Sequence, residues 1–462
     1  MKYPGGMRSL RVPSALLVLA AVACSKDDVS TTSEPSDAGV TPAPTSTTPT
    51  PNEDSGSPGV DAGPSDAGVD APPPFEPTFF DLNHVLSTGQ SLSVGSQGTP
   101  ILSTTQPYDN KMFATGVRAG GTGLTSLVPL VETGVETMSA GMSTLITSLA
   151  ETETLKGKPA PKNTHRLLVS CHGIGGTAYA GLKKGTSAFT NGMAQATAGQ
   201  ALAKAAGMTY VVRAVTNVHG ESDHIAQNAQ YEQNLVEWQK DYETDVTAIT
   251  GQKEPIPMLH TQMSSWTKYG QATSIIPSAQ LAASVKSNGK IVMVGPKYFL
   301  AYAPDGVHLN AAGYRHMGEY YAKVYRHVIL VGKTWEPVRP KSITRAGNVI
   351  RVVFHVPSPP LVFDTTLVSA IANQGFEYTD DSGAPPAITK VSLDGPDAVK
   401  IELAAAPTGG GQRVRYAFTG TAGAIGGPTA GPRGNLRDSD ATPSKNGSPL
   451  YDWAVHFDEP VP

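Results

Sequence analysis

Apolar, β-branched runs alternate with helical patterns between about residue 79 and residue 331. The apolar runs have the length and composition of buried strands. We expect strands at His84–Thr88, Arg166–Ser170, Tyr210–Val218, Ile256–Gln262 and Ile291–Val294. We expect helices around Ser139–Ala150, Ala188–Ala206, Ala226–Ile249 and Ser278–Ser287, and a last one from Asn310 to about Ile329.

The longest helical pattern indicates how these elements pack. Its apolar residues recur at spacings of three and four, at Tyr231, Leu235, Trp238, Tyr242, Val246 and Ile249. Such a stripe faces a sheet, and strands that alternate with helices form a parallel sheet covered on both faces. The pattern predicts an α/β domain over residues 78–334, with reactive residues at the carboxyl ends of its strands.

The alternation stops after about Trp335. Gly- and Pro-rich turns then separate short strand-like runs, and no helical pattern of useful length intervenes. These runs are Asn348–Val356, Ala387–Leu393, Ala398–Leu403 and Arg413–Phe418. Residues 335–462 are therefore predicted to form a second, all-β domain with the character of a small sandwich.

The first 24 residues have the features of an export signal. Positive charges precede the apolar core Ser14–Ala23, which is too short for the ~20 residues that span a bilayer. Small residues before Cys24 resemble a bacterial lipobox, which implies cleavage before Cys24 and lipidation of its thiol. The alternative is an ordinary signal peptide cut near Ala23. We expect an exported, membrane-anchored lipoprotein at the periplasm or cell surface, or else a secreted protein.

Residues 25–77 consist almost entirely of Ser, Thr, Pro, Ala, Gly and Asp. A segment with so few large apolar side chains buries too little surface to offset the entropy of ordering. We expect a disordered linker that tethers the anchor to a folded body.

Charge and cysteine content narrow the class of protein. The 462 residues have a formal net charge of -4 and no dense Lys/Arg tract, which argues against nucleic acid as the main partner. Besides Cys24 there is one cysteine, Cys171, so no intrachain disulfide is expected once Cys24 is lipidated or removed. Cys171 lies in the apolar run "RLLVSCHG" and is interpreted as a small buried residue rather than a nucleophile.

Three polar segments follow predicted strands of the α/β domain. They are Gly89–Ser91, Asn217–His224 and Pro304–Tyr314. In the last, Asp305 and His308 are three residues apart in a loop, where a turn can bring the carboxylate to one imidazole nitrogen. The other nitrogen then accepts a proton from a serine hydroxyl within about 3 Å, as a serine nucleophile requires.

Asn310 is the better N-cap candidate for the helix after this loop, which leaves Asp305 available for another role. Ser91, Asp305 and His308 are therefore chemically sufficient for a catalytic triad. An α/β-hydrolase nucleophile motif requires Gly where this chain has Ser93, and its serine does not follow the first strand.

The segments "GQSLS", "HGESD" and "DGVH", in this order, resemble the SGNH hydrolase superfamily. The resemblance is closer to its carbohydrate acetylesterase and sialate O-acetylesterase-like branch, and it covers about Leu82 to Val331. It implies a three-layer α/β/α, flavodoxin-like domain. It also implies that Ser91 is the nucleophile, His308 the general base and acid, and Asp305 the orienting carboxylate.

The resemblance also implies an oxyanion hole. The Ser91 N–H is one donor, and a backbone N–H of a glycine in "CHGIGGTAYAG", for which we choose Gly175, is a second. His219 stands where the family has Gln, and a neutral imidazole N–H can still donate. Gln90 and Glu221 are assigned supporting roles.

Other interpretations of these residues remain open. His219, Glu221, Asp223 and His224 crowd together, but their spacing fits no metal motif, and neither metal nor cofactor is expected. Ser93 is an alternative nucleophile. The segments 108–113 and 261–266 either line a substrate pocket or carry buried aromatics. The segment 450–457 is interpreted as β-domain core, with a sugar-stacking platform as the alternative.

Two hypotheses about function follow from these features. The first is an exported serine esterase, a carboxylic ester hydrolase that removes O-acetyl or other short acyl groups from carbohydrate. The second is a catalytically inactive SGNH-like lipoprotein that binds carbohydrate or mediates adhesion at the surface. The ordered triad residues favour the esterase, and His219 together with the β domain motivates the alternative.

Overall fold

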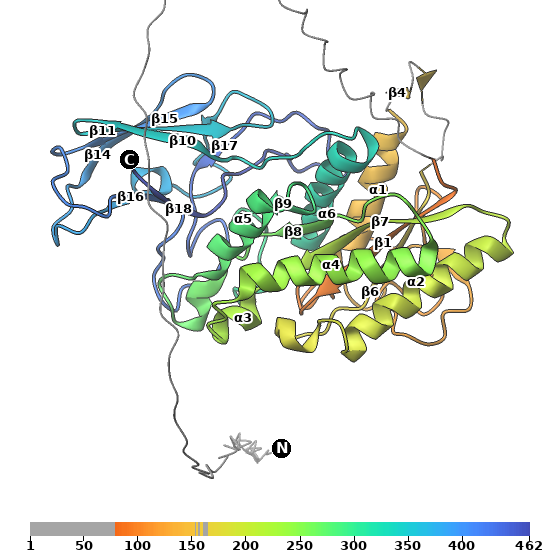
Figure 1. Ribbon diagram of the computed structural model, residues 1–462. Helices are drawn as coiled ribbons and strands as arrows, with labels where there is room; N and C mark the ends of the chain where they lie inside the picture. Colours follow the sequence, from red (N-terminus) through yellow and green to blue (C-terminus); the bar gives the residue numbers. More distant parts are fainter. Residues whose placement is uncertain (1–78, 153, 156–157, 160–164) are drawn as a thin grey trace, which may run out of the picture. The chain divides into compact units, whose positions relative to one another are not determined.

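The computed structural model describes residues 79–152, 154–155, 158–159 and 165–462 (Figure 1). The predicted signal peptide 1–24, with the lipidation residue Cys24, and the predicted linker 25–77 lie outside the described residues. None of the described helices has the length and apolar character that a membrane-crossing helix requires.

A seven-stranded sheet forms the centre of the α/β part, with strand order β3-β2-β6-β1-β7-β8-β9. All of its neighbouring pairs are parallel except β2 with β3. The strands are β1 (Leu82–Gly89), β2 (Lys111–Phe113), β3 (Leu127–Pro129), β6 (Leu167–Cys171), β7 (Tyr210–Val218), β8 (Met258–Thr261) and β9 (Ile291–Gly295). Two further strands of two residues each, β4 (Thr154–Leu155) and β5 (Lys158–Pro159), pair with each other in a separate antiparallel sheet.

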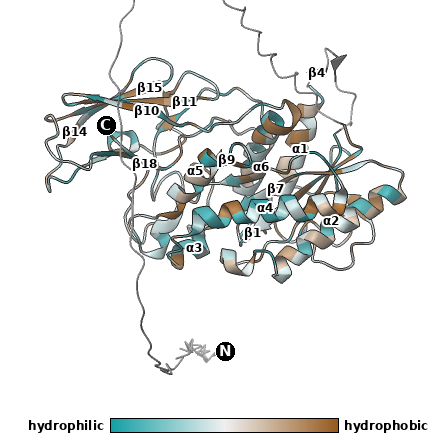
Figure 2. Ribbon diagram, in the orientation of Figure 1, coloured by the Kyte–Doolittle hydropathy of each residue, from teal (hydrophilic) through white to brown (hydrophobic). Residues whose placement is uncertain are grey.

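Helices pack on both faces of this sheet. Successive strand residues point to opposite faces, and in β1 the residues on both faces are buried, so each face needs a cover of helices. In β1, Val85 packs in one core with residues of α1 and α6, and Leu86 packs in another with residues of α2 and α4. The helices are α1 (Met138–Ala150), α2 (Ser187–Ala205), α3 (Glu221–Ile225), α4 (Tyr231–Thr250), α5 (Ile276–Lys286) and α6 (Ala311–Tyr325). Along α4, hydrophilic residues are interrupted by hydrophobic ones (Figure 2), as its predicted apolar stripe requires.

One predicted helix is divided in the structure. The expected helix 226–249 begins only at Tyr231, and a turn separates it from the short α3. Gln227 has a positive φ of 51°, which a continuing helix does not allow, and the Asn228 side chain donates to Asp223. The last helix begins where predicted, since Asn310 Oδ1 accepts from Gly313 N at 2.9 Å, and it ends in a π-helical turn, Arg326–Leu330.

Residues after 335 form three antiparallel sheets, with orders β10-β11-β15-β14, β12-β17 and β13-β16-β18. Their strands are β10 (Arg339–Ala346), β11 (Val349–His355), β12 (Val362–Phe363), β13 (Phe376–Thr379), β14 (Ile388–Leu393), β15 (Ala398–Leu403), β16 (Arg413–Tyr416), β17 (Leu436–Arg437) and β18 (Phe457–Pro460). The predicted class, a mixed α/β protein with a large, mostly parallel sheet and a β part, is confirmed.

The β part and the α/β part share a hydrophobic core. Leu281 of α5, Met293 of β9 and Tyr298 are buried in one cluster with β-part residues such as Phe376 and Trp453. The side chain of Gln262 also exchanges two hydrogen bonds with the backbone of His456, at 2.8 and 2.9 Å. The C-terminal strands therefore stabilise the end of the sheet formed by β8 and β9.

Candidate active site

Ser91 follows the central strand β1 through a turn that only glycine can make. Gly89 has a φ of +126°, and a Cβ on it would lie 2.3 Å from the carbonyl oxygen of Val218 in β7. The next amide, Gln90 N, donates to that same oxygen at 3.2 Å. This close approach of two strand ends holds Ser91, partly buried, at the carboxyl edge of the sheet.

His308 and Asp305 lie in the loop between β9 and α6. A bridge between Tyr302 and Leu309 closes this loop, and Ala303 N donates to His308 O at 2.8 Å. The loop is therefore held at its base by backbone pairing.

The structure brings the three predicted triad side chains together. His308 Nε2 lies 2.7 Å from Ser91 Oγ, and His308 Nδ1 lies 2.6 Å from Asp305 Oδ2. With the imidazole N–H on Nδ1, the carboxylate accepts from it and Nε2 accepts from the serine hydroxyl. This arrangement can remove a proton from Ser91 as the oxygen attacks a carbonyl carbon.

The surroundings of Asp305 favour its charged form. Partial burial raises the pKa of its carboxyl group, but hydrogen bonds from His308 and from two backbone amides outweigh this and hold the pKa below its usual value. The amides are Val307 N and His308 N, and both donate to Asp305 Oδ1 at 3.0 Å. Asp305 thus remains an anion that can stabilise an imidazolium on His308.

Gly175 lies beside Ser91, as an oxyanion donor must. A Cβ built on Gly175 would be 3.7 Å from the Cβ of Ser91, and the glycine is exposed. Within the described part of the chain, the backbone N–H groups of Ser91 and Gly175 donate to no protein acceptor. Both groups are therefore free to donate to a ligand oxygen.

Both ring nitrogens of His219, the predicted side-chain oxyanion donor, have partners within the protein. Its side chain is fully buried, Nδ1 lies 2.7 Å from Tyr231 Oη, and Nε2 lies 3.0 Å from Thr177 O. Burial lowers the pKa of the imidazole, although the Asp223 carboxylate opposes this, so the ring is neutral at pH 7. Because both ring nitrogens are engaged within the protein, His219 anchors the loop that carries Thr177 in this structure.

Gln90 connects the nucleophile loop to the start of α3, and Glu221 connects α3 to Ser265. Gln90 Oε1 accepts from Ser222 N at 3.1 Å. Glu221 is fully buried, and its Oε1 accepts from Ser265 Oγ at 3.3 Å. The supporting roles of both side chains stay a prediction.

Sequence reasoning missed Lys297, the buried partner of Glu221. Its Nζ is 3.5 Å from Glu221 Oε1, and both side chains have no solvent exposure. Burial lowers the pKa of the Lys297 ammonium, and the Glu221 carboxylate partly offsets this. Lys297 comes two residues after β9, so the rule that polar residues at strand ends form sites would have identified it.

The alternative nucleophiles lie outside the triad. Ser93 is buried, and its Oγ donates to Gln90 O at 2.7 Å. Cys171 is a buried free thiol whose pKa is raised by burial, so it is the small core residue that was expected.

The predicted cluster of acidic and histidine residues at 219–224 is dispersed among separate partners. Asp223 Oδ2 accepts from Tyr179 N at 2.8 Å, and His224 Nδ1 lies 2.9 Å from Ser274 Oγ. In the described ranges, no group of three or more His, Cys, Asp or Glu side chains is arranged to hold a metal ion.

The predicted pocket segments have mixed outcomes. In 108–113, Met112 and Phe113 belong to β2 and are buried. In 261–266, Ser265 donates to Glu221, and Trp266 packs against His456. The segment 450–457 lies in the core, as interpreted from its sequence.

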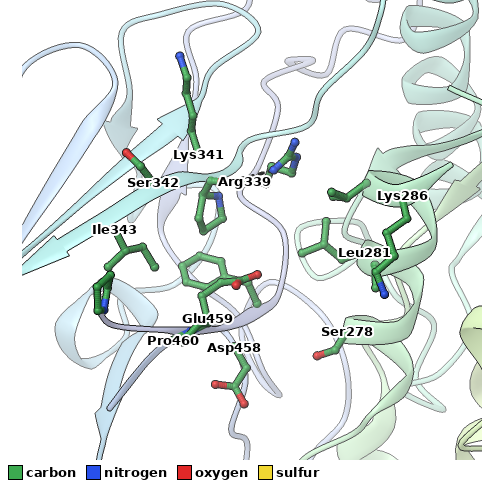
Figure 3. A pocket seen from close by; sticks show the side chains of 15 residues that line it. Ser278, Leu281, Lys286, Arg339, Lys341, Ser342, Ile343, Asp458, Glu459 and Pro460 are labelled. Atoms are coloured by element: carbon green, nitrogen blue, oxygen red, sulfur yellow. Dashed lines mark hydrogen bonds between the residues drawn. The ribbon is translucent and has the colours of Figure 1, made fainter. Parts of the chain in front are cut away.

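A cavity of about 540 Å³ lies elsewhere in the molecule, between α5 and the strands β10 and β18 (Figure 3). Leu281, Lys286, Arg339 and Asp458 are among the residues that line it. None of the predicted site residues lines this cavity, so it is separate from the Ser91 site.

Residues 149–327 match the family model described as carbohydrate esterase, sialic acid-specific acetylesterase. The matched range includes Gly175, His219, Asp305 and His308, whereas Ser91 precedes it. The match confirms the resemblance predicted from the three short motifs, and with it the class of carboxylic ester hydrolases. None of the curated proteins matches this chain.

One solved structure has a similar fold at a TM-score of 0.50, and two others match with lower scores. XAC1771, a carbohydrate acetylesterase from Xanthomonas citri, is 14% identical with a TM-score of 0.50, over 82% of this chain and 80% of that one. A protein from Arabidopsis thaliana is 15% identical with a TM-score of 0.40, over 53% of this chain and 98% of that one. Est24, a carbohydrate acetylesterase from Sinorhizobium meliloti, is 12% identical with a TM-score of 0.30, over 52% of this chain and 97% of that one.

Proposed function

We propose that this protein is an exported serine esterase that removes O-acetyl, or other short acyl, groups from carbohydrate. The observation that supports this most directly is the continuous hydrogen-bonded line from Ser91 through His308 to Asp305, at 2.7 and 2.6 Å. The family description of the matched range, a carbohydrate esterase, supports acylated carbohydrate as the substrate.

In the acylation step, Ser91 Oγ attacks the ester carbonyl carbon while His308 Nε2 takes the hydroxyl proton. The carbonyl oxygen becomes an oxyanion, which the backbone N–H groups of Ser91 and Gly175 stabilise. Asp305 stabilises the imidazolium that forms. The C–O bond to the sugar then breaks, and His308 returns its proton to the leaving alkoxide, so that a free sugar hydroxyl and an acyl-serine result.

In the deacylation step, water takes the place of the sugar alcohol. His308 Nε2 accepts a proton from the water as its oxygen attacks the acyl carbon. The bond from the acyl carbon to Ser91 Oγ breaks, and Ser91 recovers its proton from His308. The products are the free acid and the original enzyme, so the cycle needs no cofactor.

The finer parts of the proposal concern architecture and location. The helix-covered parallel sheet is consistent with a flavodoxin-like, three-layer SGNH domain over 78–334, followed by a sandwich-like β domain over 335–462. Export, and anchoring through lipid on Cys24, are proposed from the N-terminal sequence alone.

The test is a comparison of wild type, Ser91→Ala and Ser93→Ala on a chromogenic acetyl ester and on an acetylated oligosaccharide. We expect Ser91→Ala to lose at least ~10³-fold in kcat and to resist fluorophosphonate labelling. Ser93→Ala should keep its turnover because its hydroxyl lies outside the triad. Full turnover by Ser91→Ala, or a folded wild type that is neither active nor labelled, would contradict the esterase and favour the binding protein.

A further inference from the structure

A glycine-rich segment of the β part, residues 420–431, lies against the loop that carries Asp305 and His308. Gly426 N donates to Gly306 O at 2.8 Å, inside the Asp305–His308 turn. Gly423 N donates to Thr267 O at 2.7 Å, and Thr267 Oγ1 donates to Ala424 O at 2.9 Å. The 420–431 segment is therefore fixed to the α/β part on both sides of Ile425.

Ile425 is the large apolar side chain that this segment places beside the turn. Its Cβ and Cγ2 occupy the space that a side chain on residue 306 would fill, since a Cβ on Gly306 would lie 2.3 Å from each. Ile425 nevertheless remains 39% exposed. The three hydrogen bonds of its neighbours fix this exposed isoleucine next to the turn of the candidate triad, where a ligand can reach its side chain.

The chemistry of the proposed reaction defines which part of an ester reaches this side of the site. His308 must give its proton to the leaving oxygen, so the alcohol part of the substrate lies on the His308 side of the carbonyl carbon. The oxyanion lies on the other side, towards the N–H groups of Ser91 and Gly175. Ile425, in contact with the turn that carries His308, is therefore on the alcohol side.

We propose that Ile425 contacts the sugar of the bound ester and determines the preference of the enzyme for its alcohol part, and this rests on the esterase function proposed above. An apolar side chain packs well against the C–H face of a pyranose ring. The β part thus contributes to substrate selection and does not act only as a separate module.

Two substrate series test this assignment. In the alcohol series the acyl group is always acetyl, and the ratio of kcat/KM for an acetylated oligosaccharide to that for methyl acetate is measured. In the acyl series the alcohol is always 4-nitrophenol, and the ratio for acetate to butyrate is measured. Ile425→Ala is compared with Leu393→Ala, a matched control whose side chain is 40% exposed on β14 of the same β part.

We expect Ile425→Ala to lower the alcohol ratio about fivefold to tenfold and to leave the acyl ratio within about twofold of wild type. Ile425→Val keeps most of the contact, so its alcohol ratio should lie between those of wild type and Ile425→Ala. Leu393→Ala should change neither ratio. An unchanged alcohol ratio, or a shift in the acyl ratio instead, would overturn the assignment. If wild type hydrolyses none of these esters, the proposed function itself is overturned.

Discussion

The Nε2 atom of His308 lies 2.7 Å from the Oγ atom of Ser91, although 217 positions separate the two residues in the chain. Ser91 follows β1 in the middle of the sheet, and His308 comes after β9 at its edge, with β7 and β8 between them. The loop after β9 must therefore reach back across two strand ends. Hydrogen bonds at its base, and the contact of Gly306 with Ile425, hold it in that position.

Asp305→Asn should leave the fold intact and lower kcat about 10³- to 10⁴-fold. A neutral amide cannot stabilise an imidazolium, and its N–H₂ group can donate to Nδ1 and so select the wrong tautomer of His308. The Asn carbonyl can still accept from Val307 N and His308 N, which preserves the turn. Steady-state kinetics and near-ultraviolet circular dichroism check this, and a kcat within tenfold of wild type would exclude the orienting role.

Gly306→Ala should reduce kcat/KM by about 10²-fold or more, because it displaces the triad turn. Gly306 has a φ of +70°, and the added Cβ would lie 2.3 Å from Ile425 Cβ. Gly395→Ala is the control, since Gly395 has a φ of +82° with no atom within 4 Å of the added Cβ. The control should cost only about 1 kcal/mol of stability with no loss of kcat/KM. Equal effects of both variants would mean that backbone strain alone matters.

The approach of Ser91, His308 and Asp305 could be predicted from the sequence because each part is a short local pattern. A strand followed by Gly89-Gln90-Ser91, and an Asp and a His three residues apart, are visible as short patterns, and parallel strands bring their carboxyl ends to one edge. The five main strands could also be predicted from the sequence, because each is a buried apolar run. Tyr210–Val218 has the same bounds in the structure as in the prediction.

Other features depend on contacts that no local pattern encodes. The orientation of His219 is determined by Tyr231 and the Thr177 carbonyl, which come from two other parts of the chain. Strand β10 was missed because it is an edge strand with an exposed lysine and two half-buried arginines, without an alternating apolar pattern. The docking of Ile425 on Gly306 joins residues 119 positions apart, and the glycine-rich sequence around Ile425 has no pattern that predicts it.

We expect the free energy of unfolding of wild type to fall between pH 4.5 and pH 7, and Glu132→Gln should abolish this fall. Burial raises the pKa of Glu132 to about 7 from an ordinary value of 4.5, with a further increase from Glu136 and an opposing hydrogen bond from Thr137. The native state therefore keeps a proton that the unfolded chain has released. The corresponding stability is present below pH 4.5 and is lost as the pH rises through about 7, by about 3 kcal/mol in total.

Denaturant unfolding of wild type and Glu132→Gln at pH 5 and pH 8.5 measures this effect. The variant, neutral at both pH values, should lose less stability between them, and its Oε1 can still accept from Thr137 Oγ1 and Ala140 N. If both proteins change equally with pH, Glu132 is not the group responsible.

Lys297→Met should destabilise the protein by roughly 3–5 kcal/mol, because it leaves the buried Glu221 carboxylate without its cation. The double variant with Glu221→Gln should cost less than the sum of the single changes, since no uncompensated charge remains. Lys286→Met is the control. Lys286 pairs with Glu232 at the surface, and its side chain is 66% exposed. The loss of this pair should therefore cost less than about 1 kcal/mol of stability. Urea unfolding of the four variants gives the coupling, and additivity would contradict a direct ionic interaction.

Removal of residues 335–462 should prevent the remaining α/β part from folding to a soluble monomer. The deletion exposes Leu281, Met293 and Tyr298, which are buried against the β part, and it removes Asp452, which lies 2.9 Å from the buried Lys323 ammonium. An unpaired buried charge and an exposed apolar surface both favour aggregation. Size-exclusion chromatography and near-ultraviolet circular dichroism of the truncated protein measure this outcome.

A protease site inserted after Thr334, which is exposed, provides the matched control for that truncation. After cleavage the two parts should remain together on a sizing column, because Gln262 and Ser264 still bind His456 and the shared core is intact. A cleaved protein that keeps its esterase activity, beside a truncated one that aggregates, would show that stability requires the contact between the two parts and not the continuity of the chain. A soluble, active 79–334 fragment would instead show that the β part is dispensable for folding.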